Sequence, residues 1–259
     1  MTKKEKLEKY FERIGLKYEE PYEPNLEHLI ELHLAHNYTI PYENLDLLKG
    51  KKLSLDYDDL YEKFIINKRG GYCFEVNGLF GWLLRELGYN VTDYLGRYCR
   101  GETLEVPMRR HRILKVELPE GNYLADVGIG DKAQRYPLKM VEGVEQKDVD
   151  DIYKFEKDDF YGWKLMEKLP DGSWGVFFTF TEEPQAPTDF EMPSFWCERH
   201  PDSAFWKIPI FCLKAERGMV TLLGDTFRDS RGGVLIEERE LKTDEEKAEV
   251  YKKYFNLEY

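Results

Sequence analysis

The chain has 259 residues, of which 42% are hydrophobic, 15% aromatic and 34% charged, a balance typical of a folded globular protein. Its 38 basic and 50 acidic residues give a formal net charge of −12, which disfavours nucleic acid or an anionic membrane as a general partner. Residues 1–13 lack the apolar stretch of a signal peptide, and nowhere are 18 consecutive residues apolar, so we expect a cytoplasmic protein.

The first 90 residues are expected to be mainly helical. Apolar residues recur at helical spacing over 7–14 and again over 26–34. Gly15 ends the first pattern and Pro41 interrupts the chain after the second.

Strands are expected between residues 91 and 127, where the spacing of apolar residues changes to two. The alternation is clearest over 114–118, the sequence over 119–122 is typical of a turn, and residues 123–127 form a return strand. This pattern predicts a β-hairpin.

The remainder of the chain mixes strand patterns with one highly charged stretch. Residues 142–160 are rich in Asp, Glu and Lys, and we expect a flexible or inserted segment there. Strand-like runs resume at 174–180 and 219–223, and residues 244–255 predict a surface helix.

The most informative segment reads R-G-G-Y-C-F-E-V-N over residues 69–77. Gly70 and Gly71 permit a tight turn, and the following residues open an amphipathic helix that ends at Gly88. Cys73 then lies in the first helical turn, where unpaired N–H groups and the helix dipole favour a thiolate, lower its pKa and can bind an oxyanion. The alternative is an ordinary buried cysteine.

The other cysteines point to no metal or disulfide framework. The chain has four widely scattered cysteines: Cys73, Cys99, Cys197 and Cys212. They include no C-x-x-C pair, so we expect free thiols.

A thiolate nucleophile needs an imidazole to accept its proton and a third group to orient the imidazole. We choose His111, which opens the first strand of the hairpin, and Asp126, which ends the second. If Leu118 pairs with Tyr123 across the turn, Asp126 is offset from His111 by four residues, or roughly 13 Å. A bulge, a bend or a different register is therefore required. The alternative is that Asp126 only caps the turn before Gly128.

Two other histidines, His33 and His36, have the spacing of metal ligands on one helix face. No acidic residue is positioned with them, so we expect packed or solvated histidines and no metal.

Several motifs together make the sequence recognisable. Residues 69–77 resemble the R-G-G-x-C-x-E-x-N signature of the arylamine N-acetyltransferases, residues 41–46 resemble that family's P-F-E-N-L segment, and residues 126–130 resemble its D-V-G-F-G. His111 has the family's spacing from the cysteine. The resemblance spans residues 1 to about 225.

The resemblance implies an α+β fold with a core like that of cysteine proteases and transglutaminases. It implies a helical domain over 1–90 that carries the cysteine, a central antiparallel β-barrel over 91–195 that carries histidine and aspartate, and an α/β lid over 196–259.

The resemblance also implies a Cys73–His111–Asp126 triad, with a bent strand bringing the last two together. A buried bidentate contact between Glu43 and Arg69 is implied beneath the site, with a structural role.

The activity implied is acetylation of an arylamine or hydrazine, with acetyl-coenzyme A as co-substrate and no metal. The cysteine would first take the acetyl group as a thioester, and the amine would then attack it in a ping-pong mechanism. The alternatives are a thiol hydrolase with water as acceptor, an amide synthase with a tethered amine, and a non-catalytic protein that binds an aryl ligand. The sequence leaves the preferred acceptor and the oligomeric state open.

The sequence departs from the family pattern around the substrates. Ile129 replaces a common phenylalanine of the acceptor pocket, and Glu198 and Arg199 stand where Ser and Thr are usual in the segment 194–205. Candidate contacts to substrate or coenzyme are Tyr72, Met108, Arg109, Arg110, Ile129, Arg199 and His200.

A basic cluster of Arg109, Arg110 and Arg112 flanks His111 in this otherwise acidic chain. Guanidinium groups suit phosphate geometry, so the cluster is a candidate for the coenzyme phosphates. The alternative is a solvated strand end.

Overall fold

A computed structural model describes residues 1–131, 134–149 and 151–258. The first 90 residues form helices, as the spacing of apolar residues predicted. These helices are α1 (Lys3–Arg13), α2 (Leu26–Thr39), α3 (Leu45–Leu48), α4 (Tyr57–Tyr61), the π-helical turn η1 (Glu62–Ile66) and α5 (Cys73–Glu86).

Helix α5 lies at the centre of the molecule. Eleven of its 14 residues are buried, which explains why its sequence is apolar on nearly every side. One side packs against the other helices through Leu79, Phe80 and Leu83, and Leu114 and Val116 of the hairpin belong to the same core. The helix therefore joins the helical and the β-rich parts of the fold.

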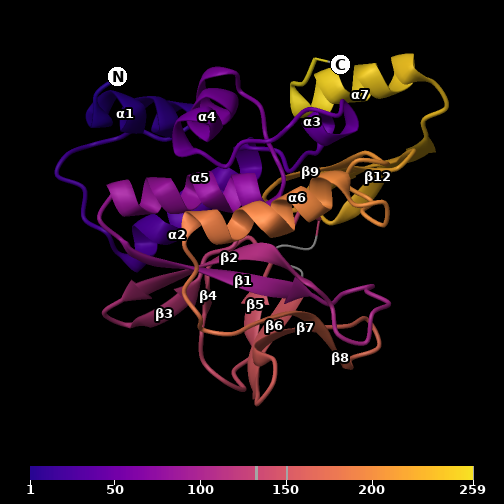
Figure 1. The fold of residues 1–259 in the computed structure, drawn as a ribbon. Helices are drawn as coiled ribbons and strands as arrows, with labels where there is room; N and C mark the ends of the chain where they lie inside the picture. Colours follow the sequence, from indigo (N-terminus) through magenta and orange to yellow (C-terminus); the bar gives the residue numbers. More distant parts are fainter. Residues whose placement is uncertain (132–133, 150, 259) are drawn as a thin grey trace.

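An antiparallel eight-stranded sheet follows α5 and forms a nearly closed barrel (Figure 1). Its strands are β1 (Asn90–Tyr98), β2 (Arg109–Leu118), β3 (Gly121–Leu124), β4 (Leu138–Lys139), β5 (Gln146–Asp148), β6 (Asp151–Asp158), β7 (Gly162–Lys168) and β8 (Trp174–Phe180). Their order is β4-β3-β2-β1-β8-β7-β6-β5. The Gln146 side chain joins the two ends of the sheet, because its amide exchanges two 2.8 Å hydrogen bonds with the backbone of Lys139.

The prediction of a flexible or inserted segment over 142–160 is wrong. Within its described residues, β5 and β6 complete the sheet, while residue 150 lies outside the described chain. Tyr153 and Phe155 are fully buried and alternate with Lys154 and Glu156. The high charge of the segment hid this strand alternation, because only one face of the strand is in the core.

The predicted β-hairpin is present, but its expected register is wrong. Leu118 pairs with Gly121, so only two residues form the turn, and Tyr123 pairs with Val116. The first strand also begins at Arg109 and not at His111. The tighter turn moves the return strand two residues along its partner and carries Asp126 closer to His111.

A second, four-stranded antiparallel sheet, a short 3₁₀ helix and two α-helices complete the described part of the fold. They are η2 (Pro187–Phe190), α6 (Glu191–Arg199), β9 (Ile210–Lys214), β10 (Gly218–Leu223), β11 (Thr226–Arg231), β12 (Val234–Glu240) and α7 (Asp244–Phe255). Helix α7 lies beside α3 (Figure 1), and Leu45 of α3 shares a core with Tyr251 and Phe255 of α7. The α+β fold class is confirmed, whereas the division into domains at residues 90 and 195 stays a prediction.

Among the described helices, none is both long and apolar enough to cross a membrane.

Candidate active site

Cys73 is the first residue of α5 and is buried, with 4% of its surface exposed. Tyr72 precedes it as the N-cap, and the Glu75 carboxylate accepts a 3.2 Å hydrogen bond from the Tyr72 N–H. The predicted position of the cysteine at a helix N-terminus is therefore correct.

The two glycines before Cys73 are needed for close packing. Neither has a left-handed backbone, but a Cβ atom added to Gly70 would lie 1.9 Å from the Pro41 carbonyl oxygen. A Cβ on Gly71 would lie 2.6 Å from the Glu75 carboxylate. The glycines let the segment beginning at Pro41 lie directly against the turn, where the Glu43 N–H donates to the Gly71 carbonyl over 2.9 Å.

The expected lowering of the Cys73 pKa is wrong for this geometry. Burial raises the pKa of the Cys73 thiol well above its ordinary value, and the neighbouring Cys197 thiol and Asp126 carboxylate add to the rise. Backbone groups of Arg112 and Phe74 oppose the shift without overcoming it. A buried thiol surrounded by potential anions stays protonated until a base removes the proton.

His111 and Asp126 lie in contact beside the N-terminal part of α5, where Asn77 donates to Asp126. His111 Nε2 is 2.6 Å from Asp126 Oδ2, and both side chains are almost completely buried. Burial opposes the charge of Asp126, but His111, Asn77 and the Gly128 N–H together hold the pKa of this carboxyl below its usual value. The carboxylate is therefore ionised and can orient the imidazole.

The end of the hairpin packs directly on the start of α5. A Cβ added to Gly128 would lie 3.1 Å from Cys73 Cα, and the Cys73 thiol lies 3.9 Å from the carbonyl oxygen of Arg110, the residue before His111. The structure thus brings Cys73, His111 and Asp126 into one neighbourhood.

Asn77 connects these elements, although our sequence reasoning assigned it no role. Its Nδ2 donates to Asp126 Oδ1 and to the Arg112 carbonyl, each over 2.7 Å, and its Oδ1 accepts from the Val127 N–H over 3.0 Å. Asn77 lies one turn after Cys73 on α5, so its spacing within the signature was a usable signal.

Glu43, which is buried, and Arg69, which is half-buried, form an ion pair, but its geometry differs from the expected two-oxygen contact. Arg69 Nε and Nη2 both donate to Glu43 Oε1, over 3.0 and 2.7 Å, whereas Oε2 accepts from the Leu45 N–H. Arg69 Nη1 also donates to Asp46 over 3.2 Å.

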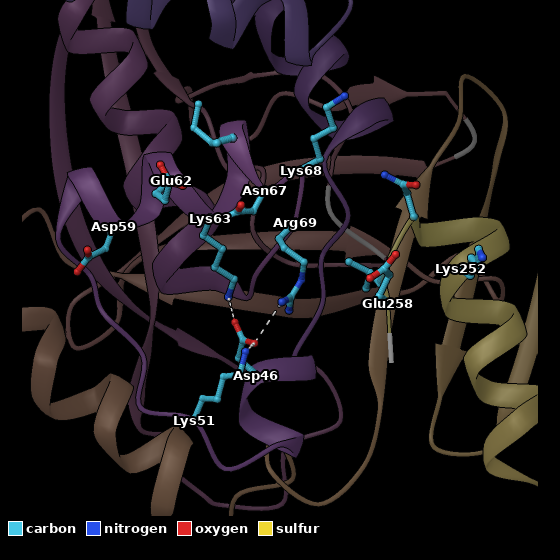
Figure 2. Close-up of a pocket in the computed structure, with 13 residues that line it drawn as sticks. Asp46, Lys51, Asp59, Glu62, Lys63, Asn67, Lys68, Arg69, Lys252 and Glu258 are labelled. Atoms are coloured by element: carbon cyan, nitrogen blue, oxygen red, sulfur yellow. Dashed lines mark hydrogen bonds and ion pairs between the residues drawn. The ribbon is translucent and has the colours of Figure 1, made fainter. Parts of the chain in front are cut away.

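A hollow of about 650 Å³ is lined by Arg69, Asp46 and Lys63, among others (Figure 2), and the residues around it do not include the Cys73–His111–Asp126 group. Lys63 and Arg69 both reach Asp46 there, and Lys63 also contacts Glu75 over 2.8 Å. These cations are already neutralised by carboxylates. We therefore interpret the network as support for the turn before Cys73.

The predicted substrate-contact residues are divided between the core and the surface. The Tyr72 hydroxyl lies 2.5 Å from Ser194 Oγ, which donates in turn to Glu198 over 3.0 Å. Glu198 therefore points into the protein and anchors α6. Ile129 packs against the barrel core, and Met108 is half-buried just before β2.

The basic cluster around His111 does not form one phosphate-binding face. Arg112 is only 1% exposed and its guanidinium pairs with Asp93 over 2.7 Å, so its proposed contact with the coenzyme is wrong. Arg109 forms an exposed pair with Glu183 over 3.0 Å. A bulge in the pairing of β1 with β2 interrupts the alternation of side chains at Arg110. The three guanidinium groups pair with three different carboxylates: Glu183, Glu102 and Asp93.

Arg110 and His200 meet the same aromatic ring. The Arg110 guanidinium lies 5.3 Å from the Trp196 ring centre, and the His200 ring stacks on Trp196 at 4.7 Å. Arg110 also pairs with Glu102 over 2.7 Å, whereas Arg199 is exposed and donates to the Gly50 carbonyl.

His33 and His36 are packed side chains. His33 Nδ1 lies 2.7 Å from the Arg135 carbonyl oxygen, and His36 Nδ1 lies 3.0 Å from the Tyr10 hydroxyl. In the described part of the chain, no three His, Cys, Asp or Glu side chains are grouped as metal ligands.

Comparisons with known proteins agree on one family. Residues 25–259 match the family model described as N-acetyltransferase. An arylamine N-acetyltransferase of Escherichia coli K12 is 36% identical over 220 residues, which cover 84% of this chain and 77% of the relative.

Solved structures give the same result over almost the whole chain. The arylamine N-acetyltransferase of Salmonella typhimurium superposes with a TM-score of 0.91 at 32% identity, covering 97% of this chain and 91% of the other. The arylamine N-acetyltransferase of Mycobacterium marinum, solved in complex with CoA, superposes with a TM-score of 0.88 at 29% identity. The match covers 96% of this chain and 92% of the other.

Proposed function

This chain belongs to the arylamine N-acetyltransferase family and is an acyltransferase, and we propose that Cys73 carries the acetyl group from acetyl-coenzyme A to an arylamine or arylhydrazine. The observation that supports this most is the 2.6 Å contact of His111 with Asp126 beside a buried cysteine at a helix N-terminus. This is the arrangement that nucleophilic acyl transfer requires.

In the first step, His111 removes the proton of the Cys73 thiol as sulfur attacks the acetyl carbonyl carbon. Nε2 of His111 faces Asp126, so Nδ1 is the nitrogen that accepts the proton. The carbon–sulfur bond to coenzyme A then breaks, and the coenzyme leaves as a thiol after receiving a proton from the imidazolium. The acetyl group remains on Cys73 as a thioester.

The proton transfer explains how a thiol with a raised pKa can be a nucleophile. Asp126 stabilises the imidazolium that forms, and backbone N–H groups at the start of α5 are suited to the oxyanion of the tetrahedral intermediate. We infer that the Cys73 thiolate and the His111 imidazolium form as a pair inside the site when the donor is bound.

In the second step, the amine nitrogen attacks the thioester carbon. Neutral His111 accepts a proton from the nitrogen and returns it to the Cys73 sulfur as the carbon–sulfur bond breaks. The products are the N-acetylated amine and the free thiol, and no proton is gained or lost overall.

The donor is supported by the family and by the relative whose structure holds CoA. We propose Arg109 for a coenzyme phosphate, because its pair with Glu183 is exposed and an exposed ion pair is easily exchanged. Arg110 contacts α6 through Trp196, and Arg199 and His200 lie at the C-terminal end of that helix; all three remain candidates for the same ligand. Tyr72, Met108 and Ile129 remain candidates for the substrates.

The decisive experiment mixes the protein with acetyl-coenzyme A and measures its intact mass before and after an arylamine is added. We expect one acetyl group on the peptide that contains Cys73, and its disappearance as acetylated amine forms. Cys73→Ser should abolish both, and a variant that kept full transferase activity would refute the proposal.

Coenzyme release without an amine would favour a hydrolase, and rejection of untethered arylamines would favour an amide synthase. Absence of both thioester and coenzyme release would favour a non-catalytic binding protein.

A further inference from the structure

Three buried side chains join the residue before Cys73 to helix α6. Tyr72, Ser194 and Glu198 are 0%, 2% and 8% exposed. The Tyr72 hydroxyl lies 2.5 Å from Ser194 Oγ, and Ser194 Oγ donates to Glu198 Oε1 over 3.0 Å. Buried polar groups are costly unless they are hydrogen-bonded, so these three side chains, named here the α6 tether, depend on one another.

The carboxylate of Glu198 fixes the direction of the hydrogen bonds in the α6 tether. A carboxylate only accepts, so the Ser194 hydroxyl gives its one proton to Glu198 Oε1, and Ser194 Oγ accepts from the Tyr72 hydroxyl. Burial raises the pKa of the Tyr72 hydroxyl well above its ordinary value, so this hydroxyl keeps the proton that it donates.

The segment between α3 and α4 holds the Glu198 end of the α6 tether. Glu198 Oε2 accepts from the Leu53 N–H over 3.4 Å, and Nη2 of the neighbouring Arg199 donates to the Gly50 carbonyl over 3.2 Å. Both residues depart from the family pattern, in which Ser and Thr are usual there. A serine at position 198 is two carbon atoms shorter and places no carboxylate at Ser194. The α6 tether is therefore a property of this sequence and is not implied by the resemblance.

The other end of the α6 tether is the N-cap of α5. The Tyr72 carbonyl oxygen accepts two hydrogen bonds, over 3.0 and 2.9 Å, from N–H groups at the start of α5. The Tyr72 ring packs edge-on against Phe74 and Phe205, with ring centres 5.5 and 5.7 Å apart. Its backbone, ring and hydroxyl are thus all held, and Cys73 is the next residue.

We propose that Glu198 is a positioning residue for acetyl transfer, because it holds the Tyr72 hydroxyl through Ser194. The α6 tether then fixes the turn at Cys73 and the backbone N–H groups at the start of α5. The inference rests on the proposed role of Cys73 as the acyl carrier. Acyl transfer needs the sulfur and the oxyanion donors in one fixed geometry, and a misplacement of about 1 Å can cost roughly 100-fold in rate.

Two substitutions at Glu198 separate its accepting oxygen from its shape. Glu198→Met has a similar length but no oxygen, so the Ser194 hydroxyl loses its acceptor. Glu198→Gln keeps one oxygen that accepts from Ser194. Tyr72→Phe removes the hydroxyl at the other end of the α6 tether and keeps the ring. The matched control is Glu191→Met, which changes an exposed glutamate at the start of the same helix.

The test measures the single-turnover rate of Cys73 acetylation by intact mass, over a range of acetyl-coenzyme A concentrations. We expect Glu198→Met and Tyr72→Phe each to lower the maximal rate about 10-fold, with the half-saturating donor concentration within about 3-fold of the wild type. Glu198→Gln should recover the rate to within about 3-fold of the wild type, and Glu191→Met should match it.

A double variant distinguishes the α6 tether from two unrelated structural losses. If Tyr72 and Glu198 act through one chain of hydrogen bonds, Tyr72→Phe combined with Glu198→Met should stay within about 2-fold of the slower single variant. Losses that multiply would contradict the proposal. It would also be contradicted by a Glu198→Gln variant as slow as Glu198→Met, or by a Tyr72→Phe variant that changes only the half-saturating donor concentration.

The wild type separates this inference from the proposed function. If wild-type Cys73 is acetylated and both single variants overlay it, the role of Glu198 is overturned while Cys73 remains the acyl carrier. If the wild type forms no thioester, the proposed function fails and this inference fails with it. Near-UV circular dichroism checks folding. If Glu198→Met does not fold, Tyr72→Phe and Ser194→Ala decide, because each removes only a hydroxyl group, and wild-type maximal rates in both would overturn the proposal.

Discussion

Asn77 donates a 2.7 Å hydrogen bond to Asp126, and through it the helix that carries Cys73 is joined to the carboxylate that contacts His111. The Asn77 amide also binds the Arg112 carbonyl and the Val127 N–H. A single side chain therefore sets the distance between α5 and both strands of the hairpin. Asn77 cannot be replaced by a group that only donates or only accepts.

We expect Asn77→Ala to reduce acetylation of Cys73 by about 10-fold or more and to destabilise the protein by ~1–3 kcal/mol, because buried partners lose their hydrogen bonds. Asn77→Asp should be worse, since a second carboxylate would face Asp126. The measurements are the acetylation rate of Cys73 and urea unfolding.

The control for this pair is Asn90→Ala, which removes an exposed side chain that donates to Glu117. It should leave both quantities nearly unchanged. Wild-type acetylation in a folded Asn77→Ala variant would contradict the proposed role.

Gly128 should tolerate no larger residue, because it packs directly against Asn77 and Cys73 of α5. An added methyl group would lie 2.7 Å from Asn77 Nδ2 and 3.1 Å from Cys73 Cα, so the hairpin would have to move away from α5. We expect Gly128→Ala to lower the acetylation rate about 10-fold or more and to destabilise the protein by ~1–3 kcal/mol. Gly175→Ala, which meets only the flexible Leu169 side chain, is the matched control.

Asp46 should make the free energy of unfolding decrease as the pH falls into the acid range. Burial raises its pKa, but Lys63, Arg69 and Lys51 lower it more, so the net pKa lies below the usual range. In the unfolded chain the carboxyl has a pKa of about 4, and in the folded protein its pKa is lower. The carboxylate therefore stabilises the folded state above about pH 4, and this stabilisation is lost as the pH falls towards the folded-state pKa.

We therefore expect Asp46→Asn to lower the free energy of unfolding by ~1–3 kcal/mol at pH 7, with a smaller difference from the wild type below about pH 4. Urea unfolding at both pH values measures this. The control is Asp58→Asn, which breaks an exposed pair with Lys6 and should have little effect at either pH. An Asp46→Asn difference that does not vary with pH would argue against the charge as its cause.

Arg109 and Arg112 should behave differently although both flank His111. Arg109→Ala should raise the KM for acetyl-coenzyme A about 10-fold while leaving the rate with p-nitrophenyl acetate, a donor without phosphates, within about 2-fold. Arg112→Met should lower thermal stability, because it leaves the buried Asp93 carboxylate paired with Arg85 alone.

The matched surface control is Arg228→Ala, which removes an exposed arginine paired with Glu238. An unchanged KM in Arg109→Ala would remove Arg109 from the coenzyme site.

Local sequence was sufficient where the relevant physics is local. The helical spacing over 7–14 and 26–34, the apolar pattern of α5 and the placement of Cys73 at its start all agree with the structure, because each depends on neighbours within about one helical turn. The choice of His111 and Asp126 rested on two ends of one hairpin, and the structure places them in contact.

Tertiary structure decided the features that depend on distant segments. The two-residue turn between Leu118 and Gly121 set the hairpin register, and pairing with Asp93 accompanies the burial of Arg112. Burial of Cys73, with the Cys197 thiol and the Asp126 carboxylate nearby, reversed the expected shift of its pKa. Burial is a property of the assembled fold, and it determines whether a charge is solvated, paired or suppressed. The sequence by itself determined which residues carry the proposed chemistry, and the fold decided which charges surround them.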